Sequence, residues 1–211
     1  MSGAAARGAV IWLAWAVLGL SGCALLGKSE PLVPRYFAPE ATGPAAAVAA
    51  AAAKGLQLQL GRIEGGTYLR ERLVVRRSAG ELAYREDRRW TERPEVYLRR
   101  ALARTLFEER GLVELHGGRA VTLDVELLAF EELEAERQAR LQLRLVLRDE
   151  RLTLLEETFT VEEPIAAGVG PAPALAVVEA LSRALHLGVA RAADAVVARL
   201  ALEASAPLGH R

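Results

Sequence analysis

Residues 119–130 read RAVTLDVELLAF and residues 140–149 read RLQLRLVLRD, and both stretches alternate apolar with polar side chains. A period of two is typical of a β-strand that buries one face and exposes the other to water. The two stretches therefore predict an antiparallel pair of strands, joined by the charged hairpin connection EELEAERQA. The apolar faces would consist of Val121, Leu123, Val125 and Leu127 in one strand and Leu141, Leu143, Leu145 and Leu147 in the other.

The sequence downstream of this pair predicts a further strand and a long helix. Residues 152–163 repeat the short strand pattern, and residues 174–204 have apolar side chains at helical spacing. The expected buried stripe of this helix consists of Leu175, Val178, Leu181, Leu185, Val189, Val196 and Leu200.

The sequence upstream predicts three short strands, at residues 56–63, 70–78 and 80–87, followed by a helix. Pro94 stands at the favoured first turn of this helix, and Gly111 is suited to end it in a left-handed conformation. The helix would bury Leu98, Ala101, Leu102, Thr105 and Leu106. The order βββ-α-βββ-α predicts an α+β domain over residues 56–205, with a largely antiparallel or mixed sheet of about six strands and two helices on one face.

The amino-terminal segment ends in Leu-Ser-Gly-Cys at residues 20–23, and Cys23 is the only cysteine. The apolar run from Ala9 to Leu20 has 12 residues. A helix that spans a membrane needs about 20 residues, so this run is too short for one. Its length fits the apolar region of a signal peptide. Such a region follows a basic residue, which here is Arg7. The motif resembles the lipobox of bacterial lipoproteins. We therefore expect residues 1–22 to be a lipoprotein signal peptide, cleaved between Gly22 and Cys23, with diacylglycerol and an N-acyl chain on Cys23.

Residues 23–55 are expected to be a lipidated, Pro/Ala-rich tether, because closely spaced prolines exclude a regular helix and the alanine run that follows has no polar face. The 189 residues left after cleavage suit one domain or at most two small ones. Removal of Arg7 leaves 26 basic against 27 acidic residues, so no basic excess points to nucleic acid as a partner.

Residues 65–106, GGTYLRERLVVRRSAGELAYREDRRWTERPEVYLRRALARTL, closely resemble a block of the ABC-type transport auxiliary lipoproteins, the PqiC/YmbA-like family. The segment RYFAPE at residues 35–40 is similar to the aromatic pair that follows the lipidated cysteine in that family. The matching positions in the longer block are Tyr68 and Leu69, Val74 to Arg76, Ser78, Leu82 to Tyr84, Trp90 and Pro94.

The resemblance implies a periplasmic lipoprotein that serves a lipid or solvent-resistance transport system. Its partners would be an MCE-domain protein and an ABC permease or related transport complex, and it would allow a homo-oligomeric ring. Ala24 follows the lipidated cysteine where an aspartate would favour the inner membrane. The expected location is therefore the periplasmic face of the outer membrane. A second interpretation is a structural adaptor lipoprotein that bridges envelope layers without a transport role.

An enzymatic function would require a nucleophile, a base and a stabilising group within reach of one another. The three histidines are His116, His186 and His210, and the sequence has neither a G-x-S-x-G elbow nor metal-ligand spacing. The sequence therefore favours a protein that is not an enzyme, with no metal and no cofactor besides the lipid on Cys23.

Seven arginines gather around the first hairpins, between residues 70 and 89. One interpretation is a solvated strand face paired with nearby Glu71, Glu81, Glu86 and Asp87. The other is a rim that binds a partner protein, with Tyr68, Arg72 and Trp90 as contacts, since aromatic residues and arginine are enriched in interface hot spots. Trp90 directly before a helix could equally fill the core.

Overall fold

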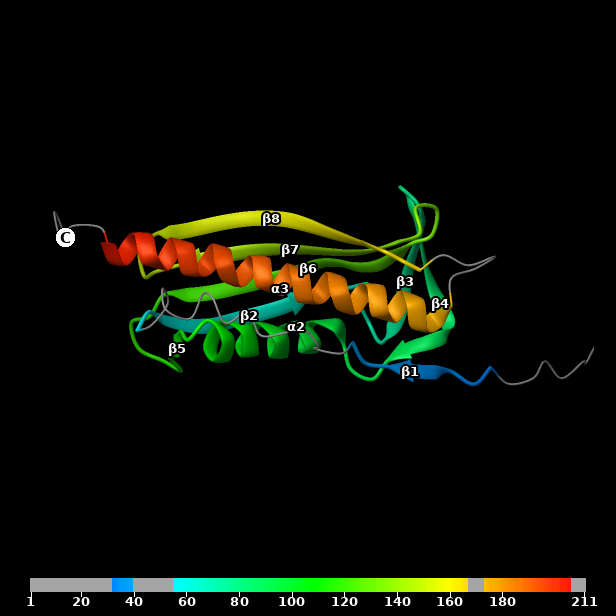
Figure 1. The fold of residues 1–211 in the computed structure, drawn as a ribbon, viewed down its shortest axis with the longest axis horizontal. Coiled ribbons are helices and arrows are strands. Elements are labelled where there is room, and N and C mark those ends of the chain that lie inside the picture. Colours follow the sequence, from blue (N-terminus) through cyan, green and yellow to red (C-terminus); the bar gives the residue numbers. More distant parts are fainter. Residues whose placement is uncertain (1–31, 40–54, 167–172, 206–211) are drawn as a thin grey trace, which may run out of the picture. The chain divides into compact units, whose positions relative to one another are not determined.

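The computed structural model describes residues 32–39, 55–166 and 173–205 of the 211-residue chain. The folded domain lies within Pro34–Arg211. Its described residues form an eight-stranded mixed sheet with two long helical segments on one face (Figure 1). The predicted α+β class is confirmed, and two very short strands add to the six that were expected.

The elements follow the predicted order. They are β1 (Arg35–Phe37), β2 (Gln57–Gly65), β3 (Arg72–Ser78), β4 (Glu81–Trp90), α2 (Pro94–Ala103), the π-helical turn η2 (Arg104–Glu109), β5 (Val113–Glu114), β6 (Thr122–Leu133), β7 (Gln138–Arg148), β8 (Thr153–Pro164) and α3 (Ala174–Ser205).

Strand β6 is the centre of the sheet. Along one side it pairs antiparallel with β7 from end to end, and β7 pairs antiparallel with β8. Along the other side β6 pairs in parallel with β2 in its first half and with β3 in its second half. The β3–β4 hairpin continues the sheet beyond β3, while β1 runs parallel to β4 and β5 runs parallel to β2.

The alternation of β6 and β7 places their leucines in the core, as predicted. Leu141, Leu143, Leu145 and Leu147 are all fully buried. The predicted hairpin connection EELEAERQA is too long, because Glu131 and Glu132 belong to β6 and are themselves buried. The pairing shifts register near Leu128, where β6 passes from β2 to β3, and the actual turn spans residues 134–137.

The two helices bury most of the predicted stripes. In the first, Leu98, Leu102 and Leu106 are fully buried, and Gly111 ends the segment at a φ of 74° as expected. In α3 the prediction is wrong for Leu175, which is 58% exposed because Ala174, Val177 and Val178 take the inward positions of the first turn. Further along, a Cβ added to Gly188 would lie 2.1 Å from Leu141 Cδ2, so this glycine lets α3 approach β7 closely.

Part of the segment expected to be a tether belongs to the domain. Residues 35–37 form β1, in register from Arg35 opposite Arg88 to Phe37 opposite Trp90. The Phe37 carbonyl accepts a hydrogen bond from the Thr91 amide at 2.9 Å, and the Phe37 ring packs against the core. The stretch between Cys23 and the domain is therefore residues 24–34, and residues 40–54 follow β1. None of the helices in the described ranges is both long and apolar enough to cross a membrane.

Candidate partner-binding site

Trp90 lies in the core, not on a binding surface. Its side chain is 1% exposed and packs against Phe130, at 5.3 Å between ring centroids, and against Tyr97, at 6.1 Å in an edge-on arrangement. The hypothesis that Trp90 contacts a partner is therefore corrected. The alternative interpretation, that a tryptophan directly before a helix fills the core, agrees with the structure.

Tyr68 is half-buried in the loop between β2 and β3. Its hydroxyl donates a hydrogen bond of 2.6 Å to the carbonyl of Leu128, the residue at the register shift of β6. The Tyr84 hydroxyl in turn donates to the Tyr68 carbonyl at 3.1 Å. Burial, and then the negative charge of Glu131, raises the pKa of Tyr68. Tyr68 thus joins the β3–β4 hairpin to the middle of the sheet, with only part of its ring open to solvent.

Arg72 is the most open of the three residues predicted to bind a partner. It lies at the start of β3 and forms an ion pair of 3.1 Å with Glu86 of β4. Both side chains are substantially exposed, at 42% and 62%. An ion pair between exposed side chains of adjacent strands is what the solvated strand face predicts. Such exposed pairs contribute little to stability.

The neighbouring arginines pair with buried glutamates far away in the sequence. Arg76 makes two hydrogen bonds to the carboxylate of Glu131, at 2.7 and 3.2 Å, and Glu131 is 0% exposed. Arg85 binds Glu132 at 3.0 Å and Glu134 at 3.0 Å. The Glu131 carboxylate raises the pKa of Arg76 and keeps it charged. We call these five residues the glutamate clamp; they lie where β3 joins β6 in parallel.

The glutamate clamp was not found from the sequence. The sequence pattern predicts Glu131 and Glu132 in the charged turn, where solvation is the usual state of a carboxylate. The sequence signal for their burial is that Glu131 and Glu132 directly follow a strand with period-two alternation. If that strand continues by two residues, both glutamates belong to the sheet. Only the parallel pairing of β3 with β6 shows which arginines meet them.

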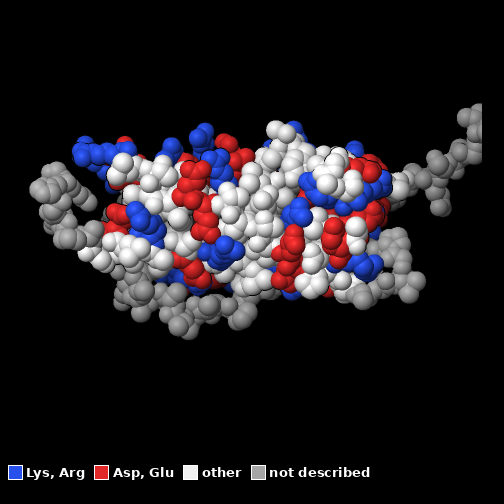
Figure 2. Space-filling view, turned by 90° about the horizontal axis from the view of Figure 1, so that it is seen from above, with Lys and Arg blue, Asp and Glu red and all other residues white. Residues whose placement is uncertain are grey.

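The open face of the sheet carries paired charges. Arg148 meets Asp124 at 2.8 Å, Arg144 meets Glu156 at 2.6 Å, and these pairs lie between adjacent strands. Figure 2, which views the molecule at right angles to Figure 1 from the side of β8, shows basic and acidic side chains interleaved on that side as well. A surface of this kind has no large field of one sign that would attract a strongly charged polymer.

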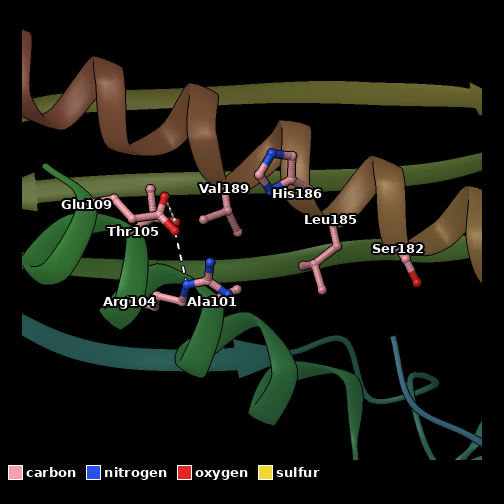
Figure 3. A pocket seen from close by; sticks show the side chains of 8 residues that line it. All are labelled: Ala101, Arg104, Thr105, Glu109, Ser182, Leu185, His186 and Val189. Carbon is pink, nitrogen blue, oxygen red and sulfur yellow. Dashed lines mark hydrogen bonds and ion pairs between the residues drawn. The ribbon is translucent and has the colours of Figure 1, made fainter. Parts of the chain in front are cut away.

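A shallow groove runs between α2–η2 and α3 (Figure 3). It contains Ser182 and His186 on α3 and Glu109 on η2, a combination of side chains that could suggest catalysis. However, the Ser182 hydroxyl donates to the Val178 carbonyl of its own helix at 2.8 Å and points away from His186. Glu109 is bound by Arg104 at 3.0 Å and by the Thr105 hydroxyl at 3.2 Å. The groove therefore lacks the contact between nucleophile and base that a hydrolase requires.

The other histidine that the structure describes, His116, does not build a site either. His116 is 83% exposed in its side chain, with Nδ1 3.9 Å from a Glu114 oxygen, and His210 lies outside the described residues. Within the ranges that the structure describes, no group of histidine, cysteine, aspartate and glutamate side chains could hold a metal ion.

A larger cavity of about 610 Å³ lies between β1 and the first half of α3. Its described walls include Tyr36 and Phe37 from β1 and Leu175, Val178 and Leu187 from α3. Sequence reasoning missed this cavity because it assigned β1 to the tether. The aromatic pair of RYFAPE was the signal that these residues have a structural role.

The family model for the "ABC-type transport auxiliary lipoprotein component" matches residues 39–196. The chain belongs to this family. Among solved structures, a protein from Xanthomonas campestris is similar, with a TM-score of 0.69 and 18% identity over 82% of this chain and 100% of that one. A second, uncharacterized protein has a TM-score of 0.62 and 15% identity over 78% of this chain and 99% of its own. These two likenesses concern the fold alone. No curated protein matches.

Membership of the auxiliary lipoprotein family agrees with the resemblance noted in residues 65–106. It supports a role as an accessory lipoprotein associated with an ABC-type transport system and with the cell envelope. The predicted lipidation and cleavage residues, Gly22 and Cys23, lie outside the described residues. Their roles stay predictions, as do the partner contacts of Tyr68 and Arg72.

Proposed function

We propose that this protein is a lipoprotein anchored to the periplasmic face of the outer membrane through acyl chains on Cys23. It acts as a non-catalytic accessory component of an MCE/ABC-type system that moves lipids between the two membranes. The observation that carries the proposal is the family match over residues 39–196. The Leu-Ser-Gly-Cys motif supports the lipid anchor, and Ala24 supports the outer membrane as its location.

The partners in this proposal are an MCE-domain protein and an ABC permease or a related transport complex, with a homo-oligomeric ring as the assembled form. The contact surface is the end of the β2–β3 loop and the start of β3, with Tyr68 and Arg72, whose side chains are partly open to solvent. Ser182 is hydrogen-bonded to the Val178 carbonyl, and Glu109 is paired with Arg104. Because both side chains are engaged in this way, they support a binding role for the protein and not a catalytic one.

The lipid anchor is tested with Cys23→Ser. Because acylation of the thiol precedes cleavage in lipoproteins, this variant should accumulate as a precursor that still carries residues 1–22. The measurements are palmitate labelling and the mass of the purified chain, followed by separation of inner and outer membranes. Unchanged labelling in the variant, or a wild-type chain found mainly in the inner membrane, would contradict the corresponding part of the proposal.

The partner surface is tested by copurification from membranes with Tyr68→Ala and Arg72→Ala. An aromatic hot spot typically contributes at least about 2 kcal/mol to binding, which corresponds to a loss of about 30-fold in affinity. Arg62→Ala is the matched control for Arg72, because Arg62 also forms an exposed pair, with Glu64, but on β2. His186→Ala is the control for a catalytic role, because His186 lies in the groove between α2–η2 and α3.

We expect Tyr68→Ala and Arg72→Ala to lose the transport complex while both controls keep it, with all four proteins folded by circular dichroism. Full copurification of Tyr68→Ala and Arg72→Ala would remove this surface from the proposal. A wild-type protein that copurifies with envelope proteins but never with an MCE-domain protein or a permease would instead favour the structural adaptor.

A further inference from the structure

Strand β1 fixes the point at which the anchoring segment enters the domain. Arg35, the first residue of β1, follows Cys23 by 12 positions. Twelve extended residues reach at most about 40 Å, and a flexible chain of that length has a mean end-to-end distance of about 20 Å. If Cys23 is lipidated, as proposed above, the bilayer therefore lies close to β1.

An apolar surface lies immediately beside this entry point. Tyr36 is 63% exposed, and Leu175 and Leu187 of α3 are 58% and 46% exposed. All three line the same cavity of about 610 Å³. Phe37 and Val178, which are more buried, also line it. Exposed apolar groups gathered in one place mark surfaces that contact something other than water.

The polar groups around this cavity suit a membrane interface. Arg35 of β1 is exposed, with its guanidinium carbon 5.2 Å from the centroid of the Phe37 ring. Arg183 lines the cavity, donates to the Pro164 carbonyl at 2.7 Å and forms an ion pair with Glu163 at 3.1 Å. Glu179 is the acidic residue that lines the cavity. Tyrosine prefers the boundary between headgroups and acyl chains, and basic side chains there interact favourably with anionic lipids.

We propose that the β1–α3 surface, formed by Tyr36, Phe37, Leu175, Val178 and Leu187, contacts the bilayer that holds the acyl chains of Cys23. This inference rests on the proposed lipidation. The start of α3 then faces the membrane, and its end points away from it, since β1 lies near the first turns of α3 and far from the last ones (Figure 1). The domain is a docked element with a fixed orientation, and not a body suspended on a long tether.

The chain offers a matched pair of reporter positions on one helix. Leu175 and Leu202 are both exposed leucines of α3, at 58% and 63%. They are 27 residues apart in the sequence, which corresponds to about 40 Å along a helix. Cys23 is the only native cysteine, and acylation blocks its sulfur, so Leu175→Cys and Leu202→Cys each provide one free thiol.

Each variant is purified from membranes as the processed lipoprotein, labelled with bimane and reconstituted into vesicles of phosphatidylethanolamine and phosphatidylglycerol. Half of the preparations contain lipids with doxyl groups on their acyl chains. We expect the label at position 175 to shift to the blue and to be quenched by the doxyl lipids. The label at position 202 should keep the emission of a water-exposed dye and its full intensity.

The following results would overturn the proposal. Equal quenching at both positions, or quenching at neither, would show that the β1–α3 surface is not the membrane contact. Emission at position 175 that is already blue-shifted in buffer without vesicles would show that something other than the bilayer covers the surface. A blue shift that grows with protein concentration in detergent would show that a second copy covers it.

Mass spectrometry of the same preparations separates this proposal from the one on which it rests. A chain without the added acyl mass would overturn both the lipid anchor and the docking. A chain that carries the acyl mass but shows no selective quenching at position 175 would overturn the docking alone.

Discussion

Replacement of Trp90 by alanine should destabilise the domain strongly, because the structure places this side chain in the core. Trp90 is 1% exposed and contacts the rings of Phe130 and Tyr97. Truncation of a buried aromatic residue to alanine costs about 3–5 kcal/mol. Since a domain is stable by only about 5–15 kcal/mol, Trp90→Ala should lose a large part of its free energy of unfolding.

The assay is urea unfolding of the domain without residues 1–22, followed by far-UV circular dichroism. The wild-type protein also reports directly on its own core, because Trp12 and Trp15 lie within residues 1–22, which this form lacks, and Trp90 is the only tryptophan left. We expect its fluorescence to be blue-shifted in the folded state and poorly quenched by acrylamide, and to become red-shifted and accessible on unfolding.

The variant Trp90→Phe serves as the matched control, since it keeps an aromatic ring against Phe130 and should cost less than Trp90→Ala. A double-mutant cycle with Phe130→Ala should give a coupling energy of about 0.5–1.5 kcal/mol, as found for aromatic pairs. If Trp90→Ala unfolds at the urea concentration of the wild type, or if native Trp90 is readily quenched by acrylamide, the assignment of Trp90 to the core is wrong.

Two further substitutions test the packing of α3 and the glutamate clamp. Gly188→Ala should lower the unfolding free energy by about 1–2 kcal/mol, because its Cβ would lie 2.1 Å from Leu141 Cδ2; a higher urea midpoint than that of the wild type would show that Leu141 moves aside freely. Arg76→Ala should cost about 3 kcal/mol because it removes the bidentate partner of the fully buried Glu131. Its control, Arg72→Ala, breaks only an exposed pair and should cost less than about 1 kcal/mol; equal thermal melting temperatures for the two arginine variants would refute the role of the clamp.

The sequence by itself determined the elements whose signal is local. The alternation of residues 121–127 and 141–147 was sufficient to predict β6 and β7 with their correct buried faces, because a strand turns successive side chains to opposite sides. Pro94 and Gly111 marked the start and the end of the first helical segment for equally local reasons of backbone geometry. Family membership, too, could be anticipated from the residues around Tyr68 and Trp90.

The tertiary structure alone decided which distant segments meet. A strand pattern does not reveal its neighbours, so the parallel pairing of β6 with β2 and β3 could not be foreseen, nor could the contact of Arg76 with Glu131, 55 positions away. Residues 35–37 are too few to show a period, and only their pairing with β4 makes them a strand. The burial of Glu131 and Trp90 and the surface between β1 and α3 depend on these long-range pairings, which arise from the packing of the whole sheet and not from any single stretch of sequence.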